Sequence, residues 1–203
     1  MISVEDVTKY YGETMAVDHL SFQAKPGLVT GFLGPNGSGK STTMRVILDL
    51  DQANSGRATI NGAHYRDLRF PLREVGALLD ANAVSPKFTA RTHLRALAAS
   101  NQIPLSRVDE MLEFTGITSI ATKKIADYSL GMRQRFGIAA ALLGDPGVVL
   151  FDEPVNGLDP EGIRWFRGCL RSMADEGRTV LISLHLINEL AQCADEVVVI
   201  GKG

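Results

Sequence analysis

The stretch "GFLGPNGSGKSTTMRVIL", residues 31–48, decides the fold of this 203-residue chain. It holds eight residues that match the phosphate-loop pattern GxxxxGK[ST]: Gly34, Pro35, Asn36, Gly37, Ser38, Gly39, Lys40 and Ser41. An apolar run over residues 28–33 comes before the loop and a helical pattern follows it, which is the setting that this motif needs. Glycines let backbone N–H groups approach phosphate oxygens, and the start of the helix adds partial positive charge. The stretch therefore predicts a nucleoside triphosphate site.

This phosphate loop (the P-loop, residues 34–41) also carries side chains for the ligand's charge. We expect Lys40 to neutralise the β and γ phosphates and the Ser41 hydroxyl to bind Mg²⁺. Thr42, the next residue in the helix, is expected to contact the nucleotide as well. The alternative is a glycine-rich turn with no ligand, which the strand–loop–helix setting disfavours.

Two carboxylates follow a second apolar run in "VVLFDEPVNGLDP", residues 148–160. Asp152 stands where the aspartate of a P-loop enzyme binds the metal. Glu153 is next along the strand and points another way, so it can face the γ-phosphate as a general base. His185 follows the apolar run 179–184 and is expected to contact the γ-phosphate, although a lone histidine is more often structural. Together these residues predict hydrolysis of the bound nucleotide.

Apolar and β-branched runs alternate with amphipathic stretches along the chain, which is typical of an α/β protein with a parallel sheet. The runs expected to form strands are Ile2–Val7, Leu28–Leu33, Ala58–Ile60, Val75–Leu79, Val148–Phe151, Thr179–Leu184 and Glu196–Ile200. Residues 83–135 read as helical, without a convincing strand, and predict a lobe inserted into the α/β core.

Several helix ends are also expected from the sequence. Ser106, with Asp109 three residues later, resembles a capping box, and Gly116 is expected to close that helix. Asp159 before a proline predicts another helix start, with the helix stopping at Gly177. A further start lies in "ADYSLGMRQRFG", residues 126–137, where basic residues follow at once. Such a start can hold an anion, although its serine can equally be a simple N-cap.

With the P-loop, "YSLGMRQR" at 128–135 and "LFDEPVNGLD" at 150–159, the sequence closely resembles the ATPase subunit of an ATP-binding-cassette (ABC) transporter. The resemblance covers essentially the whole chain. It implies a P-loop NTPase fold of the α/β class, a RecA-like core with an N-terminal antiparallel β part and an inserted α-helical subdomain. Residues 1–203 would then form one ABC ATPase domain, with the nucleotide-binding core at 1–82 and 136–203 and the helical subdomain at 83–135.

The resemblance also implies how the second anion site is used. "YSLGM" aligns with the family's signature motif, usually LSGGQ, and keeps its serine and second glycine as Ser129 and Gly131. Its first glycine has become Leu130 and its glutamine Met132. In this family two cassettes pack head to tail, so Ser129 and Gly131 would complete an ATP site on a second copy of the chain. Loss of the γ-phosphate on hydrolysis would loosen that pair.

Further roles are implied position by position. Tyr11 matches the aromatic residue that stacks on adenine, with Tyr10 as a rival and a core tyrosine as the alternative. The D-loop, which lies along the dimer interface, is matched by residues Asn156, Gly157, Leu158 and Asp159. His185 matches the switch histidine. Asp80 occupies the position of the family's Q-loop glutamine, where it could still bind Mg²⁺ through a shorter arm.

The stretches "FTARTHLRALA", "SLGMRQRFGIAAALLGDP" and "DEPVNGLDPEGIRWFR" are most similar to bacterial drug and antibiotic exporters of the daunorubicin and bacitracin-resistance type. In these the ATPase is a separate chain, peripheral on the cytoplasmic face of the membrane, below an integral permease. The helical lobe would face that permease, near Asp80.

Composition limits the alternatives. A formal charge of −2 gives no electrostatic case for nucleic-acid binding, although cassettes that act on nucleic acid or on ribosomes form the alternative class. No apolar run approaches the length of a membrane span, and the acidic residue at position 5 argues against a signal peptide. Cys169 and Cys193 match no metal spacing and are expected to be free thiols in a reducing cytoplasm.

Overall fold

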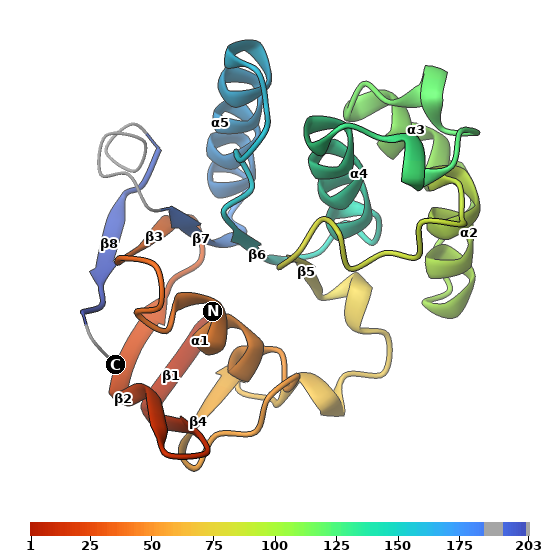
Figure 1. Cartoon of the computed structure of the whole chain (residues 1–203). Helices are drawn as coiled ribbons and strands as arrows, with labels where there is room; N and C mark the ends of the chain where they lie inside the picture. The colour runs from red at the N-terminus through yellow and green to blue at the C-terminus, as the bar shows by residue number, and fades with distance from the viewer. Residues whose placement is uncertain (185–192, 202–203) are drawn as a thin grey trace.

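A computed structural model describes residues 1–184 and 193–201, in two sheets with helices between and above them (Figure 1). Its central sheet is parallel and has the strand order β5-β6-β7-β3-β8. The bounds of these strands are β3 Val29–Leu33, β5 Val75–Leu78, β6 Val148–Asp152, β7 Thr179–Leu184 and β8 Glu196–Val199. Strands β6 and β7 are almost entirely buried, as their continuous apolar sequences require. Every strand of this central sheet was expected from the sequence, and each begins and ends within one residue of its expected bounds.

A second, antiparallel sheet has the order β2-β1-β4, with β1 at Ile2–Tyr11, β2 at Thr14–Ala24 and β4 at Ser55–Ile60. Strand β2 was not among the expected strands. Its residues are mostly exposed or half-buried, and its pairing with β1 is irregular, because register shifts interrupt the ladder. An irregular edge strand with one solvated face lacks the continuous apolar run that marked the core strands.

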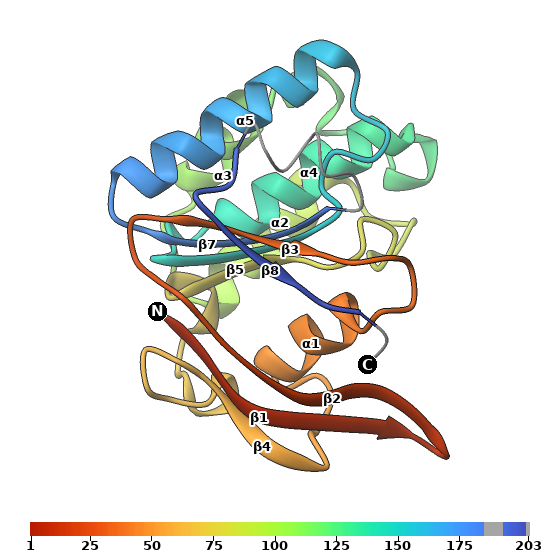
Figure 2. The ribbon, with the colours of Figure 1, turned by 90° about the vertical axis from the view of Figure 1, so that its left-hand side faces the viewer.

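Helix α1 (Lys40–Ile47) lies between the two sheets, as Figure 2 shows. Met44 and Ile47 pack there with β1, β4 and one face of the central sheet. The side chains of β6 alternate: Val148 and Leu150 belong to this cluster, whereas Val149 and Phe151 belong to the cluster on the opposite face. The P-loop helix is therefore fixed from both sides by apolar packing.

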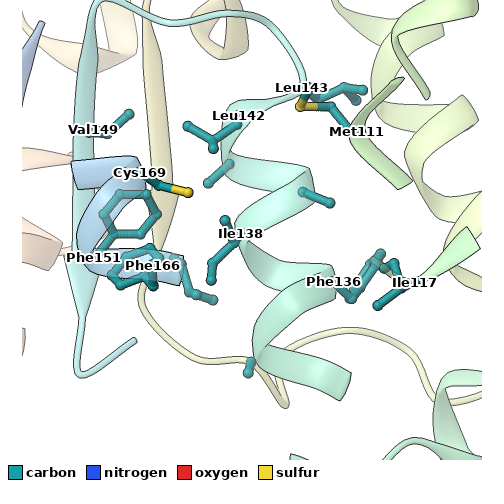
Figure 3. Packing of buried hydrophobic residues seen from close by; sticks show 14 of the residues in the cluster. Met111, Ile117, Phe136, Ile138, Leu142, Leu143, Val149, Phe151, Phe166 and Cys169 are labelled. Carbon is teal, nitrogen blue, oxygen red and sulfur yellow. The ribbon is translucent and has the colours of Figure 1, made fainter. Parts of the chain in front are cut away.

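The opposite face of the central sheet carries α2 (Ala90–Ser100), α3 (Ser106–Phe114), α4 (Leu130–Leu142) and α5 (Pro160–Asp175). Figure 3 shows buried side chains of this cluster, with Phe151 of β6 beside Phe166 of α5 and Ile138 of α4 nearby. The rings of Phe151 and Phe166 meet edge to face, 5.2 Å between centroids. Short 3₁₀ turns at Tyr65–Asp67, Pro71–Arg73, Thr118–Ile120 and Ile125–Asp127 connect the larger elements.

Helix ends agree with the expectations except at α3. Asp159 caps α5, accepting a hydrogen bond from the Gly162 N–H, and Gly116 and Gly177 follow their helices with positive φ. The expected capping box at Ser106 and Asp109 is wrong: Leu105 is the N-cap residue and Ser106 is already helical. Asp109 instead forms an ion pair with Arg91 of α2, so a contact between helices competes successfully for its carboxylate.

The helical lobe joins the core through α4. Helices α2 and α3 lie within residues 83–135, but α4 runs from 130 to 142 and so crosses the expected boundary at 135. None of the helices in the described ranges has the length and apolar character that crossing a bilayer requires.

Candidate active site

The P-loop joins the carboxyl end of β3 to α1 and closes around its own lysine. The Lys40 side chain is buried, and its Nζ donates to the carbonyl oxygens of Gly34 at 2.6 Å and Pro35 at 3.1 Å. Gly39 is the N-cap residue of α1, with φ +98° and no side-chain cap. A Cβ on Gly39 would lie 2.3 Å from the Ala16 carbonyl oxygen, so only glycine fits there.

The same loop has the features of an anion site. The first N–H groups of a helix have no partner within it, and no side-chain cap occupies them in α1. The Ser38 hydroxyl is buried and has no hydrogen-bond partner among the described residues. A phosphate would supply acceptors for these donors. The loop therefore fits a polyphosphate ligand.

Asp152 and Glu153 stand at the carboxyl end of β6. The two oxygens of the Asp152 carboxylate accept hydrogen bonds from different hydroxyls, Oδ2 from Ser41 and Oδ1 from Ser183. Glu153 has a left-handed backbone, φ +46°, which turns the chain sharply after the strand. Its Oε2 accepts a hydrogen bond of 2.7 Å from the Asn156 Nδ2. A carboxylate and a hydroxyl in contact at the P-loop form a donor set that suits Mg²⁺.

These groups share one cavity of about 560 Å³. Most of residues 36–42, from the P-loop into α1, line it, together with Asp80, Asp152 and Glu153. Asp80 is exposed at its rim, and its Oδ1 accepts a hydrogen bond from the Asn82 N–H. The structure thus brings most of the predicted phosphate and metal residues to one opening.

Tyr11 lies at the end of β1, 47% exposed, so the alternative of a core tyrosine is wrong. Its hydroxyl donates to the Asp51 carboxylate, which Arg45 also binds. Partial burial and the bond to Asp51 raise the pKa of Tyr11. The Arg45 guanidinium and the Tyr11 hydroxyl hold the pKa of Asp51 below its ordinary value. The Lys9 ammonium lies 5.0 Å from the centre of the Tyr11 ring.

Tyr10, the rival of Tyr11, is 41% exposed, and its backbone N–H is hydrogen-bonded to Asn54. Exposure alone does not separate the two tyrosines. The Tyr11 hydroxyl is distinguished by its bond to Asp51, a carboxylate that Arg45 in the last turn of the P-loop helix also binds.

The second helix start differs from the first. Ser129 is the N-cap of α4, and its Oγ accepts a hydrogen bond of 3.3 Å from the Met132 N–H. Gly131 lies against the D-loop, because a Cβ there would come within 2.5 Å of the Gly157 carbonyl oxygen. Leu130 also lies against Gly157, where a Cβ would come within 2.5 Å of the Leu130 Cγ, and it lines the cavity. Within a single chain Ser129 therefore acts as a simple N-cap, which was the alternative to an anion site.

Three polar residues of the site were not among the predicted catalytic, nucleotide-binding or metal-binding residues. Ser183 is fully buried on β7, and Asn156 contacts Glu153. Gln134 of α4 lines the cavity, and its buried Oε1 has no hydrogen-bond partner in the described part of the chain. Gln134 follows Leu130 by four residues, a helical spacing that placed it on the same face. Ser183 carried no signal, because one serine in an apolar strand resembles a structural residue. His185 lies outside the described residues.

Comparisons with known proteins agree with this geometry. Residues 17–156 match the family model described as ABC transporter. The chain is 39% identical over its full length to the bacitracin transport ATP-binding protein BcrA of Bacillus licheniformis, of which it covers 67%. It is 30% identical to the lantibiotic transport ATP-binding protein SrtF of Streptococcus pyogenes, of which it covers 88%.

Solved structures give the same answer. The chain aligns along its whole length, at a TM-score of 0.91 and 25% identity, with 95% of the bacterial ABC transporter cassette MJ0796 in its dimeric structure. A post-hydrolysis dimer of that cassette, bound to ADP and Pi, aligns with the same score. The chain belongs to the ABC transporter family, as an ATP-binding and ATP-hydrolysing subunit.

Proposed function

We propose that two copies of this chain pack head to tail around ATP and drive export through a separate membrane permease. The bacitracin and lantibiotic transport proteins among its relatives support an antibiotic or peptide exporter. In this proposal the chain acts from the cytoplasmic face of the cell membrane and binds no nucleic acid.

The observation that carries the proposal is the division of the two anion sites within one chain. Ser129 is exposed at the start of α4, and neither Ser129 nor Gly131 is among the described residues that line the P-loop cavity, although the apolar Leu130 between them is. A helix N-terminus attracts an anion only over short range. A second copy, turned head to tail, would place its α4 start over this cavity and supply the missing donors. The dimeric cassette among the structural neighbours supports this arrangement.

Within the site, Lys40 and the N–H groups of the P-loop would bind the β and γ phosphates. Ser41 and Asp152 would hold Mg²⁺, with Asp80 as a further ligand at the rim. When bound, Mg²⁺ neutralises charge on the phosphates. Glu153 would accept the proton of the attacking water, with its carboxylate held by Asn156.

Groups outside the cavity would complete the nucleotide site. Tyr11 would stack on adenine, since its ring is exposed and its hydroxyl is anchored by Asp51. Asp159 would lie at the dimer interface while its carboxylate caps α5. His185 would contact the γ-phosphate.

A shallow apolar cavity beside Asp80 is the proposed contact with the permease. It has a volume of about 260 Å³ and lies between the 79–84 segment and α4, with Val84 and Phe136 among its lining residues. This position joins the proposed core (1–82 and 136–203) to the proposed helical subdomain (83–135). A short helix of a permease would bury its apolar face there.

Glu153→Gln tests the proposed function. This variant keeps the hydrogen bond from Asn156 possible but removes the base, so it should bind ATP, hydrolyse it at least about 100-fold more slowly, and elute as a dimer in ATP. Lys40→Ala is the matched control and should stay monomeric. A monomeric Glu153→Gln elution in saturating ATP would contradict the shared site.

The exporter assignment needs its own test. We expect the chain to co-purify from membranes with an integral protein of several spans, identified by mass spectrometry. Val84→Glu, in the apolar cavity beside Asp80, should lose that partner and keep ATP-dependent dimerisation. Recovery of ribosomal or nucleoid components instead would favour the alternative class.

A further inference from the structure

Ser183 is hydrogen-bonded to both acids of the site, Asp152 and Glu153, although the mechanism proposed above gives it no role. It lies on β7, directly opposite Asp152 in the parallel ladder between β6 and β7. The residue is 0% exposed, in a strand whose other side chains are apolar or, at Thr179, hydroxylic. A hydroxyl buried so completely is stable there only if it is hydrogen-bonded.

Among the described residues, both hydrogen bonds of the Ser183 hydroxyl go to the acid pair. The Ser183 hydroxyl donates to Oδ1 of Asp152, and its Oγ accepts a hydrogen bond of 3.1 Å from the Glu153 N–H. The Ser183 carbonyl oxygen accepts from the same N–H at 3.2 Å. One serine therefore uses its donor on the first acid and its acceptors on the backbone of the second.

We propose that Ser183 is a positioning residue that selects which oxygen of Asp152 faces the metal. With Oδ1 bound to Ser183 inside the sheet, Oδ2 is the oxygen turned toward Ser41 at the start of α1. Without that donor, the carboxylate can rotate about its terminal torsion, which has no deep preferred well. The inference rests on the proposed metal role of Asp152.

Ser183 acts on Glu153 in a different way. Glu153 has a left-handed backbone, a conformation that a non-glycine residue keeps only when its surroundings hold it. Both bonds from its N–H end on Ser183, but one of them ends on the main-chain carbonyl, which any residue supplies. Loss of the hydroxyl should thus disturb Asp152 more than Glu153.

Ser183→Ala tests this proposal, because it removes one oxygen and leaves the strand otherwise intact. Two quantities are measured on the whole chain: the affinity for a fluorescent ATP analogue in EDTA and in Mg²⁺, and the Mg²⁺ concentration that half-saturates turnover. Residues that orient a metal ligand typically contribute about 10- to 100-fold to metal affinity or activity. We expect Ser183→Ala to bind nucleotide normally in EDTA. The Mg²⁺ concentration that half-saturates its turnover should rise by at least about tenfold. Ser183→Thr, which keeps the hydroxyl, should restore the Mg²⁺ requirement of the unchanged protein.

Thr30→Val is the matched control. Thr30 lies on β3, the strand beside β7, and its buried hydroxyl has no partner among the described residues. This variant removes a buried hydroxyl from the same sheet and should leave the Mg²⁺ requirement unchanged. If Ser183→Ala keeps the ordinary Mg²⁺ requirement, or if Thr30→Val raises it equally, the proposal is wrong. Full turnover by Glu153→Gln would instead overturn the base role, and the Mg²⁺-dependent binding of Ser183→Ala would still report on Ser183.

Discussion

The starts of α1 and α4 are both suited to an anion, yet they are built in opposite ways. Helix α1 begins at a glycine with positive φ, has no side-chain cap and buries its first residue, Lys40. Helix α4 begins at Ser129, whose side chain caps the helix, and this start is exposed. An uncapped, enclosed start reserves its N–H groups for a ligand, whereas a capped, exposed start is stable alone. The first suits a chain's own nucleotide and the second suits one presented by another molecule.

Lys40→Ala should have the largest effect. It removes the cation of α1's start, and turnover should fall by about 10³-fold or more, with loss of ATP binding. Turnover and binding of a fluorescent ATP analogue are the measurements. If turnover were unchanged, the start of α1 would not bind the nucleotide through Lys40, and the P-loop assignment would be wrong.

Ser129→Asp should have the next largest effect. Aspartate caps helices as well as serine does, so stability should not change. Its negative charge would face the γ-phosphate of a partner's ATP, and turnover should fall by about 100-fold at unchanged affinity for ATP in the monomer. Ser129→Asn, a neutral cap, is the matched control and should retain more activity.

A mixture sharpens the same point. Combining Ser129→Asp with Lys40→Ala subunits should leave one composite site in which both halves are intact. Turnover should exceed that of either variant alone. A mixture no more active than its components would count against sites shared between copies.

Alanine substitutions at Gly39 and Gly131, the glycines at the starts of α1 and α4, should differ in how much they destabilise the protein. Gly39→Ala forces a Cβ onto the Ala16 carbonyl in a left-handed conformation, and Gly131→Ala meets the Gly157 carbonyl without that backbone strain. We expect both to lower the free energy of unfolding, by about 1–3 kcal/mol for Gly131→Ala and by more for Gly39→Ala. Urea denaturation measures the difference. Equal losses would mean that the left-handed turn at Gly39 adds no strain.

The smallest effect concerns the C-terminal end of α1, where a basic residue is present that α4 lacks at its own C-terminal end. Arg45, in the last turn of α1, binds Asp51, whereas the last turn of α4 has no basic residue. Because the pKa of Asp51 is lowered in the folded state, its contribution is complete above its unfolded pKa of about 4 and is lost as pH falls through the folded value. The stability difference between the unchanged protein and Asp51→Asn should be at most about 1 kcal/mol at pH 7 and should shrink near pH 3. A difference that grows on acidification would contradict this.

Local pattern was enough for the parts of the site that lie in continuous segments. The P-loop glycines and the apolar runs before Lys40 and Glu153 are short-range signals, and the structure places them at one cavity. Strand β2 was not predicted because its half-exposed residues form no continuous apolar run. The Ser106 expectation failed because Arg91, from another helix, binds Asp109.

By itself the sequence determined the P-loop strand–turn–helix, the carboxylates after β6 and the apolar runs of the core strands, because each depends on the order of neighbouring residues. Only the tertiary structure decided that Ser183 faces Asp152 and that Asn156 contacts Glu153. It also decided that the Tyr11 hydroxyl is bonded to Asp51 beside Arg45. These pairings depend on strand order, register and chain reversal, which place residues far apart in the sequence, or on opposite sides of a turn, within hydrogen-bond distance.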